Sequence, residues 1–237
     1  MTETTPRQRA RIETEAQIAA IGNRMIDDDG VDGLSLRAIA RELGVVSSAV
    51  YRYVKSRDEL LTILIRDAFT QIADAVDEAL EGERSVKTLA LRMLEWSRAY
   101  PNRWALIYGT PIADYEAPRE QTVVPGTRIM VALAELVAET QGDAEGAPES
   151  GAKSKRSAAK GSQAKGGRRG VEAALQPLRD GLAELGLGYG DHVIMETVTI
   201  WVAIIGLING LRFGQFGPGF DGVEGDLMSG VVARLGE

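Results

Sequence analysis

The chain contains no cysteine among its 237 residues. This absence excludes disulfide bridges, thiol nucleophiles, cysteine-bound metals and redox sensing through a thiol. Histidine is almost absent too: His192, beside Asp191 at a predicted helix start, is the single one, and we expect it to be structural or exposed. We therefore predict no metal site and no cofactor, and a chain without cysteine fits a reducing cytoplasm.

Aromatic residues make up only 5% of the chain, although 44% of it is hydrophobic. The chain is long enough for a small domain and a larger one, and their cores must be mainly aliphatic. Long uncharged apolar runs are also missing, since the most apolar stretch, 193–211, contains Glu196 and several polar residues. The N-terminus has no apolar signal core. We predict no membrane segment and a cytoplasmic location.

The short signatures of common enzyme classes do not occur in the sequence. It has no GxSxG elbow, no HExxH pair and no GxxxxGK[ST] phosphate loop, and GLGYG at 186–190 lacks the third glycine of a dinucleotide loop. No alternating strand pattern appears, whereas helical spacing of apolar residues recurs along the chain. The sequence thus predicts an all-α protein that is not an enzyme.

The most informative segment is SLRAIARELGVVSSAVYRYVKSRDELLTIL, residues 35–64. Apolar residues at three- and four-residue spacing in 36–43 predict a short helix that Ser35 can cap. Gly44 then permits a tight turn, and we expect Val45 to fill the corner between two crossing helices. The second helix is predicted over 47–54, with Val50 and Val54 buried.

This second helix has the residue order of a helix that reads DNA. Small residues at its start let the helix N-terminus approach the major groove, and hydroxyl, aromatic and basic groups then reach phosphates or base edges. The net charge of −7 means that attraction to phosphates must come from such a local patch. Tyr51 and Arg52 are the strongest candidates, and Arg57 extends the positive edge. The predicted DNA contacts are Arg37, Val46, Ser47, Ser48, Ala49, Tyr51, Arg52, Tyr53 and Lys55.

The run ARELGVVSSAVYRYVKSRDELL resembles the DNA-binding segment of the TetR family, including the tyrosine and the basic residue before Asp-Glu-Leu. The resemblance implies a three-helix head in which residues 9–28 form the supporting helix. It also implies three partners: a double-stranded DNA operator, a second copy of the chain and a small-molecule effector. Val46 departs from the family pattern, which commonly has a small hydroxyl residue capping the recognition helix here. Ser47 or Ser48 is expected to cap instead.

Two features before this segment have alternative interpretations. Arg7, Arg9 and Arg11 form either a basic arm that touches DNA, as in many TetR-like proteins, or a frayed soluble tail. The acidic residues 27–29 could suggest a calcium loop, but the remaining ligands are missing, so we interpret them as a solvated helix end. In the supporting helix, Ile12, Ala16, Ala19 and Ile26 are predicted to face inward.

The chain is predicted to divide into a helix-turn-helix DNA-binding domain, 1–55, and a helical ligand-binding and dimerisation domain, 56–237. Residues 142–170 are rich in Gly, Ala, Ser and Lys and are predicted to be a disordered insertion. Its basic part, 151–169, is either a nonspecific DNA tether or merely solvated. The helices of the larger domain are predicted at 57–80, 83–98, 119–140, 171–185, 191–213 with Asp191 as cap, and 221–235.

The tracts 100–118 and 213–220 resemble the C-terminal domain of a TetR subgroup named for a Trp-His-Gly signature, and Trp104 and Gly109 are kept. Aromatic and methionine side chains suit an amphipathic organic ligand, although packing between helices explains the same spacing. If the turn at Pro101 permits, the aromatic residues share one helical face. The predicted ligand residues are Trp96, Tyr100, Trp104, Tyr108, Met130, Met195 and Thr199.

The stretch 193–211 is apolar on nearly all faces and, with the last helix, is predicted to form a dimer interface, or else to be an ordinary buried helix. We therefore predict a transcriptional regulator that binds a two-fold operator as a dimer, most simply a repressor that a small molecule releases. The alternatives are a helix-turn-helix-headed multidrug-binding protein or helical enzyme without operator function, and a nonspecific DNA-organising protein that uses the basic loop.

Overall fold

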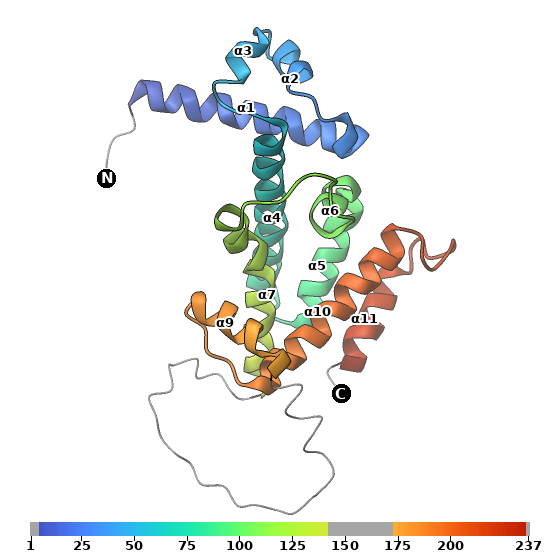
Figure 1. The fold of residues 1–237 in the computed structure, drawn as a ribbon. Coiled ribbons are helices and arrows are strands. Elements are labelled where there is room, and N and C mark those ends of the chain that lie inside the picture. The colour runs from blue at the N-terminus through green and yellow to red at the C-terminus, as the bar shows by residue number, and fades with distance from the viewer. Residues whose placement is uncertain (1–4, 142–172, 236–237) are drawn as a thin grey trace, which may run out of the picture.

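The computed structural model describes residues 5–141 and 173–235, and their regular structure is entirely helical (Figure 1). The prediction of an all-α fold is confirmed. The predictions of an insertion at 142–170 and of a basic tether at 151–169 fall outside the described residues. The helices are α1 Pro6–Asp29, the 3-10 helix Val31–Gly33, α2 Leu36–Glu42, α3 Ser47–Val50, α4 Arg57–Gly82, α5 Val86–Ala99, α6 Pro101–Tyr108, α7 Arg119–Gln141, α9 Gln176–Glu184, α10 Asp191–Arg212 and α11 Glu224–Leu235.

Helices α1 to α3 and the first turns of α4 surround one apolar core. We call this group of helices the head. Helix α1 begins with a capping box, in which Thr5 and Gln8 exchange hydrogen bonds. Its C-terminal half contributes Ile18 and Ile26 to the core. The prediction that Ile12 and Ala16 face inward was wrong: Ile12 is 58% exposed, because the first turns of α1 extend beyond α4 into solvent (Figure 1).

Helix α4 connects the head to the rest of the molecule. Ser56 caps it by accepting a hydrogen bond from the Glu59 backbone N–H at 3.1 Å. With 26 residues, α4 is about 39 Å long. Its first turns bury Leu60 and Leu64 in the head core, and its later turns bury Ile72 and Val76 in a second core. The predicted boundary at 55/56 therefore falls at the start of a helix that both cores share.

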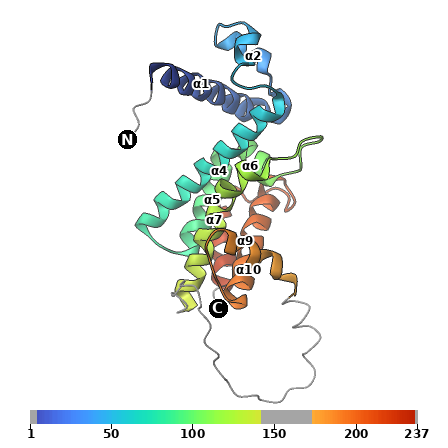
Figure 2. The ribbon, with the colours of Figure 1, turned by 60° about the vertical axis from the view of Figure 1, so that its left-hand side comes forward.

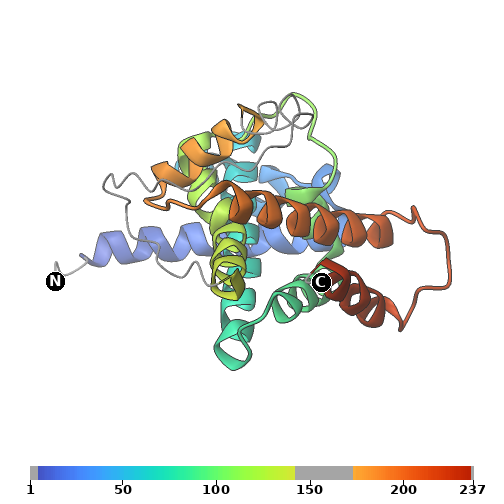
Figure 3. The ribbon, with the colours of Figure 1, turned by 90° about the horizontal axis from the view of Figure 1, so that it is seen from below.

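The second core lies between α4, α5, α6, α7, α10 and α11 (Figures 1 and 2). We call these six helices the sensor, after the ligand-binding role that the sequence predicts for this part of the chain. Helices α5 and α7 pack along α4, α10 crosses α7, and α11 packs on α5 and α10 (Figure 3). Aliphatic side chains such as Leu89, Leu133 and Ile204 fill most of this core, as the composition predicts. Trp104 is also fully buried there.

Several predicted boundaries in the sensor differ from the structure. The N-cap of α10 is Gly190, and Asp191 makes no cap hydrogen bond because it forms an ion pair with Arg179 at 2.6 Å. The last helix begins at Glu224 rather than at 221, because the preceding segment contains four glycines with positive φ that end regular structure. Helix α9 covers only part of the predicted 171–185.

Among the described residues, α10 is the one helix that is long and apolar enough to cross a membrane. Close to half of its most apolar window, 44%, is buried inside the structure. It contacts α5, α6, α7 and α11. A core helix of a helical bundle passes the same test of length and composition.

Trp104 has a partly buried polar partner. Its indole N–H donates to the Asn209 side-chain oxygen at 2.9 Å, and the Asn209 amide donates to the Tyr108 carbonyl at 3.2 Å. We expect Trp104→Phe to lower the free energy of unfolding by roughly 1–3 kcal/mol, because the Asn209 oxygen loses its donor in a partly buried place. Urea denaturation at fixed protein concentration measures this.

The matched control is Trp201→Phe, since Trp201 is only partly buried and no hydrogen bond joins its indole to the described residues. That change should cost less than about 1 kcal/mol. Equal losses in the two variants would show that the hydrogen bond from Trp104 contributes nothing of its own.

Candidate functional site

Helices α2 and α3 are joined by a turn that the sequence predicts correctly at Gly44. Ser35 caps α2, accepting from the Ala38 backbone N–H at 3.4 Å. Gly44 has φ of +69°, where a side chain would be strained, and the Val45 N–H donates back to the Ala40 carbonyl at 3.0 Å. Val45 itself does not fill the corner as predicted, because it is 43% exposed.

Helix α3 is shorter than predicted. It spans Ser47–Val50, and single turns continue the chain to Val54. Its N-cap is Val46, without a side-chain hydrogen bond, so neither Ser47 nor Ser48 acts as the cap. Val50 and Val54 are both buried, as the spacing predicts. Burial of these two valines holds α3 against the head and leaves its other side free.

The structure brings the predicted DNA contacts together at the end of the head that is farthest from α9, α10 and α11 (Figure 1). Arg37 of α2 is exposed, and so are Val46, Tyr51 and Arg52, with Val46 71% and Tyr51 44% exposed. Large apolar side chains in solvent beside basic ones are typical of a binding surface. Ser48 and Lys55 are exposed too, whereas Ser47, Ala49 and Tyr53 are partly buried.

Other basic residues of the head have structural partners. The Arg57 guanidinium donates to the Val31 carbonyl at 2.8 Å. Arg57 was predicted to extend the positive edge, but in the structure it makes this contact within the head. Arg9 and Arg11 lie inside α1 rather than on a frayed tail. The Arg11 side chain pairs with Glu15 at 2.7 Å, and this hydrogen bond raises the pKa of Arg11.

The predicted aromatic residues do not share one helical face. Tyr100 separates α5 from α6, so they form two tilted pairs, with an interplanar angle of 48° in each and ring centroids 5.3 Å apart for Trp96 and Tyr100 and 4.6 Å for Trp104 and Tyr108. Trp96 and Trp104 are buried in the sensor core, and Tyr100 is 37% exposed. Packing between helices, the alternative reading of this spacing, accounts for their positions.

Tyr108 is the exception within this cluster. Its hydroxyl is buried and has no hydrogen-bond partner among the described residues, and burial raises the pKa of Tyr108 far above its ordinary value. Its ring lies 5.8 Å from that of Phe69 on α4 and 5.9 Å from that of Trp201 on α10. Tyr108 therefore connects α4, α6 and α10.

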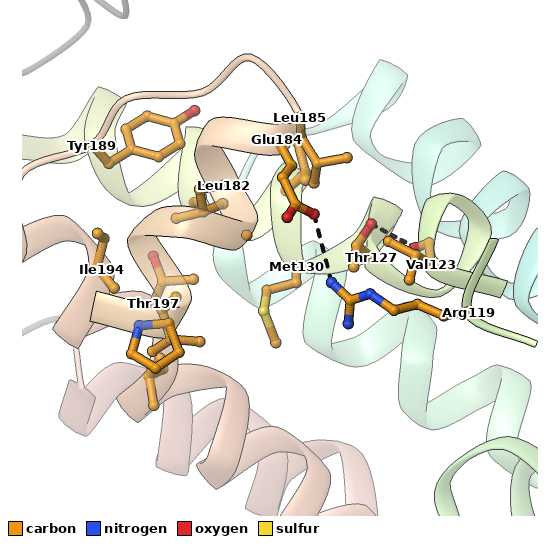
Figure 4. A pocket seen from close by; sticks show the side chains of 16 residues that line it. Arg119, Val123, Thr127, Met130, Leu182, Glu184, Leu185, Tyr189, Ile194 and Thr197 are labelled. Carbon is orange, nitrogen blue, oxygen red and sulfur yellow. Dashed lines mark hydrogen bonds and ion pairs between the residues drawn. The ribbon is translucent and has the colours of Figure 1, made fainter. Parts of the chain in front are cut away.

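An apolar cavity of about 240 Å³ lies elsewhere, between α7, α9 and α10 (Figure 4). Met130 is the one predicted ligand residue that lines it. Met195 and Thr199 are on the exposed side of α10 instead, and Met195 is 38% exposed. The lining that the prediction missed includes Thr127, Leu178, Gly181, Leu182, Tyr189 and Thr197.

Comparison with known proteins agrees with the geometry of the head. Residues 18–62 match the family model of bacterial regulatory proteins of the tetR family, and residues 86–234 match a tetracyclin repressor-like C-terminal domain. HTH-type transcriptional regulators of Mycobacterium tuberculosis and Mycobacterium bovis are 37% identical over 223 residues, covering 89% of this chain and 86% of theirs. The chain belongs to the TetR family.

Solved structures are similar over nearly the whole chain. A regulatory protein with 25% identity superimposes with a TM-score of 0.71 over 98% of both chains. A Rhodococcus protein of unknown function shares the fold, with 22% identity, a TM-score of 0.61 and 94% and 95% coverage. A nicotine-responsive transcriptional repressor of Paenarthrobacter nicotinovorans is 26% identical over 84 residues, 35% of this chain and 43% of that protein. The TetR-family chain is thus a DNA-binding transcriptional regulator rather than an enzyme.

In this TetR-family regulator, Arg103 of α6 joins the sensor to the head. Its guanidinium donates to both carboxylate oxygens of Asp27 at the end of α1, at 2.7 and 2.5 Å, and to the Gln71 side-chain oxygen on α4 at 2.7 Å. Asn102 adds a hydrogen bond to the Asp27 carbonyl at 2.9 Å. Asp27, predicted to be part of a solvated helix end, is therefore an interdomain partner.

The contacts of Arg103 continue through α4. Gln71 donates to the Asp67 carboxylate at 2.8 Å, and the Asn23 amide of α1 donates to the same carboxylate. We call Asn23, Asp27, Asp67, Gln71 and Arg103 the interdomain cluster. Because Arg103 is only 9% exposed, its charge depends on these partners rather than on water. The cluster fixes α1, α4 and α6 relative to one another.

We expect Arg103→Met to lower the free energy of unfolding by on the order of 2–4 kcal/mol, because Asp27 and Gln71 lose a charged donor in a place with little water. Chemical denaturation checks the value. Arg11→Met is the matched control, since Arg11 pairs with Glu15 at 2.7 Å on the surface of α1 and its side chain is 65% exposed. That change should cost far less, and a similar loss in both variants would contradict a special role for Arg103.

Proposed function

We propose that this TetR-family regulator is a repressor that binds a two-fold operator as a homodimer and leaves it when a small molecule occupies the sensor. The observation that carries the proposal is the arrangement of α4. One rigid helix is packed at one end into the exposed helix-turn-helix and along the other end against α7, which lines the cavity. A regulator of transcription acts where the DNA is, so we place it in the cytoplasm.

In the proposed complex, α3 enters the major groove. Tyr51 and Arg52 contact base edges or the adjacent phosphates, and Ser48 and Lys55 contact the backbone. The exposure of these four side chains at the end of the head supports this role. Arg37 of the neighbouring α2 reaches a phosphate at the same edge.

The homodimer is proposed to form through α10 and α11. Exposed residues at four- and three-residue spacing form one stripe along α10, and α11 lies beside it with exposed small residues such as Gly230. The stripe carries no charge and includes Val202, which is 62% exposed, and Phe213, which is 47% exposed. The members of this stripe on α10 are Met195, Thr199, Val202 and Gly206, and Phe213 follows directly after the helix. A second copy that covers the stripe would place two heads on one operator.

Release from the operator is proposed to be a shift between two conformations. An effector that binds one of them more tightly favours that one, and its differential affinity sets the loss of DNA binding. Movement of α7 reaches the head through α4, and movement of α6 reaches α1 through the interdomain cluster. Two heads that are displaced in this way no longer match successive major grooves.

Two other functions make different predictions. A multidrug-binding protein without operator function has no preferred site in the DNA beside its own gene. A nonspecific DNA-organising protein binds operator and random duplex equally, with steep salt dependence. Footprinting the purified dimer on the neighbouring DNA at physiological salt, beside a random duplex of equal length, distinguishes all three.

We expect Arg52→Ala to weaken operator binding by roughly 1–3 kcal/mol, since Arg52 would lose its base or phosphate contact. Fluorescence anisotropy with the footprinted operator measures the dissociation constant. Arg66→Ala removes the same charge from an exposed position on α4 outside the helix-turn-helix and serves as control. An operator affinity that changes equally in both variants would argue against a contact by Arg52.

We expect Val202→Glu to raise the dimer dissociation constant roughly tenfold or more, because a carboxylate would be buried without a partner between two copies of α10. Sedimentation analysis over a range of protein concentrations detects this. Val124→Glu is the control, because Val124 is 64% exposed on α7, away from the stripe. A Val202→Glu protein that remains as dimeric as the control would place the interface elsewhere.

A further inference from the structure

Helix α9 covers the cavity between α7 and α10 but is weakly attached to the rest of the protein. None of its residues is buried, and its apolar residues Leu178 and Leu182, with Leu185 just after it, line the cavity rather than a packed core. The side of α7 that faces them contributes residues at regular helical spacing, namely Val123, Thr127, Met130 and Ala134. The cavity is therefore a space between helices that are far apart in the sequence (Figure 4).

Two ion pairs hold the ends of α9. Arg179 pairs with Asp191 at 2.6 Å, next to the start of α10. Glu184 pairs with Arg119 of α7 at 3.5 Å, with the two side chains 68% and 76% exposed (Figure 4). The start of α9 is held more firmly, because the Arg179 side chain is 28% exposed and the N-cap residue Leu175 is buried. The exposed Arg119–Glu184 pair at the other end contributes little stability. The C-terminal end of α9 can therefore move away from α7 and admit a molecule at small energetic cost.

The chemistry of the lining specifies the kind of molecule. Most of the described lining is aliphatic, and among the described residues Arg119 and Glu184 are the charged side chains that line it. These two charges compensate each other at one end of the cavity. The hydroxyls of Thr127 and Thr197 donate to backbone carbonyls one turn earlier, at 2.8 and 2.7 Å, so their oxygens remain available as acceptors.

A charged ligand would lose hydration in this cavity without gaining an unpaired counter-charge. An apolar molecule gains by burial, and one donor group can be satisfied by a threonine oxygen. The volume of about 240 Å³ is somewhat below the roughly 300–1,000 Å³ of common ligand sites, which favours a small ligand. The paired charges, the mainly aliphatic lining and the volume all favour a small, uncharged organic compound.

We propose that the cavity under α9 is the effector site, and that its ligand is a small, uncharged, mostly apolar organic molecule with one hydrogen-bonding group. That this ligand acts as an effector rests on the function proposed above. The occupant separates α7 from α10, and α7 transmits that displacement because it packs along α4. This site lies between different helices from the aromatic pairs and uses Met130 alone of the residues that the sequence predicted.

The test uses the full-length protein and two fluorescent probes with one ring skeleton. N-phenyl-1-naphthylamine is uncharged, and 8-anilinonaphthalene-1-sulfonate adds a sulfonate. We expect the uncharged probe to bind one site per protomer in a saturable manner. Gly181→Leu should weaken that binding at least tenfold, because Gly181 lines the cavity and an added Cβ there meets no atom within 4 Å, so a leucine side chain has room to occupy the space of the ligand.

Ala183→Leu is the matched control, since Ala183 is exposed on the same helix and receives a similar side chain. It should leave the affinity unchanged. Gly181→Ala adds a single methyl group and should weaken binding only a few-fold, so that a graded response follows the volume filled. Equal probe affinity in Gly181→Leu, Ala183→Leu and the unaltered protein would overturn the site.

The charge of the ligand is tested separately. The unaltered protein should bind the uncharged probe more tightly than the sulfonate. Glu184→Gln leaves Arg119 without its partner, so it should improve binding of the sulfonate by roughly two- to fivefold, the change expected at an exposed pair. Tighter binding of the sulfonate by the unaltered protein would overturn the uncharged class.

A titration of operator DNA with the uncharged probe separates this inference from the proposed function. Probe binding that Gly181→Leu abolishes, together with a lower operator affinity only in proteins that bind the probe, is the expected result. If the probe binds as expected and operator affinity stays constant, release by an effector at this site fails while the binding site stands. If operator binding is intact and Gly181→Leu still binds the probe, the site fails and the DNA-binding regulator stands.

Discussion

The structure depends on the burial of one helix in two cores. Helix α4 has an apolar stripe that runs from Leu60 in the head to Val76 in the sensor. Because protein cores are close-packed, neither end of such a helix can shift without a response from the side chains around it. The head therefore cannot be regarded as an independent domain on a flexible linker. Its orientation follows from the position of α4 between α5 and α7.

A second, polar connection runs beside this apolar one. Arg103 joins α6 to α1 and α4 through Asp27 and Gln71. In the loop after α6, the Tyr115 hydroxyl lies 2.9 Å from the Thr62 hydroxyl on α4. Apolar packing is tolerant of small displacements, whereas a bidentate guanidinium–carboxylate contact requires a defined geometry. The two connections together allow the head to move in a limited number of ways, which a regulator with two discrete conformations requires.

The helices of the larger domain are not all packed equally tightly. The aromatic residues and the long core helices are tightly packed, while α9 is attached by ion pairs and by side chains that border a cavity. Elements with few buried contacts are those that open most easily. The proposed entry route for a ligand at α9 and the proposed route of transmission through α7 and α4 thus lie in adjacent parts of one domain.

The sequence by itself determined what depends on neighbouring residues. Capping by Ser35, the turn at Gly44 and the burial of Val50 follow from spacing over a few positions, so the helix-turn-helix and the family could be predicted. Only the tertiary structure decided that Asp27 meets Arg103, that Trp104 belongs to the core, and that a cavity forms between α7, α9 and α10. These contacts join residues tens of positions apart, and periodicity along one helix indicates which face is apolar but not which helix covers it.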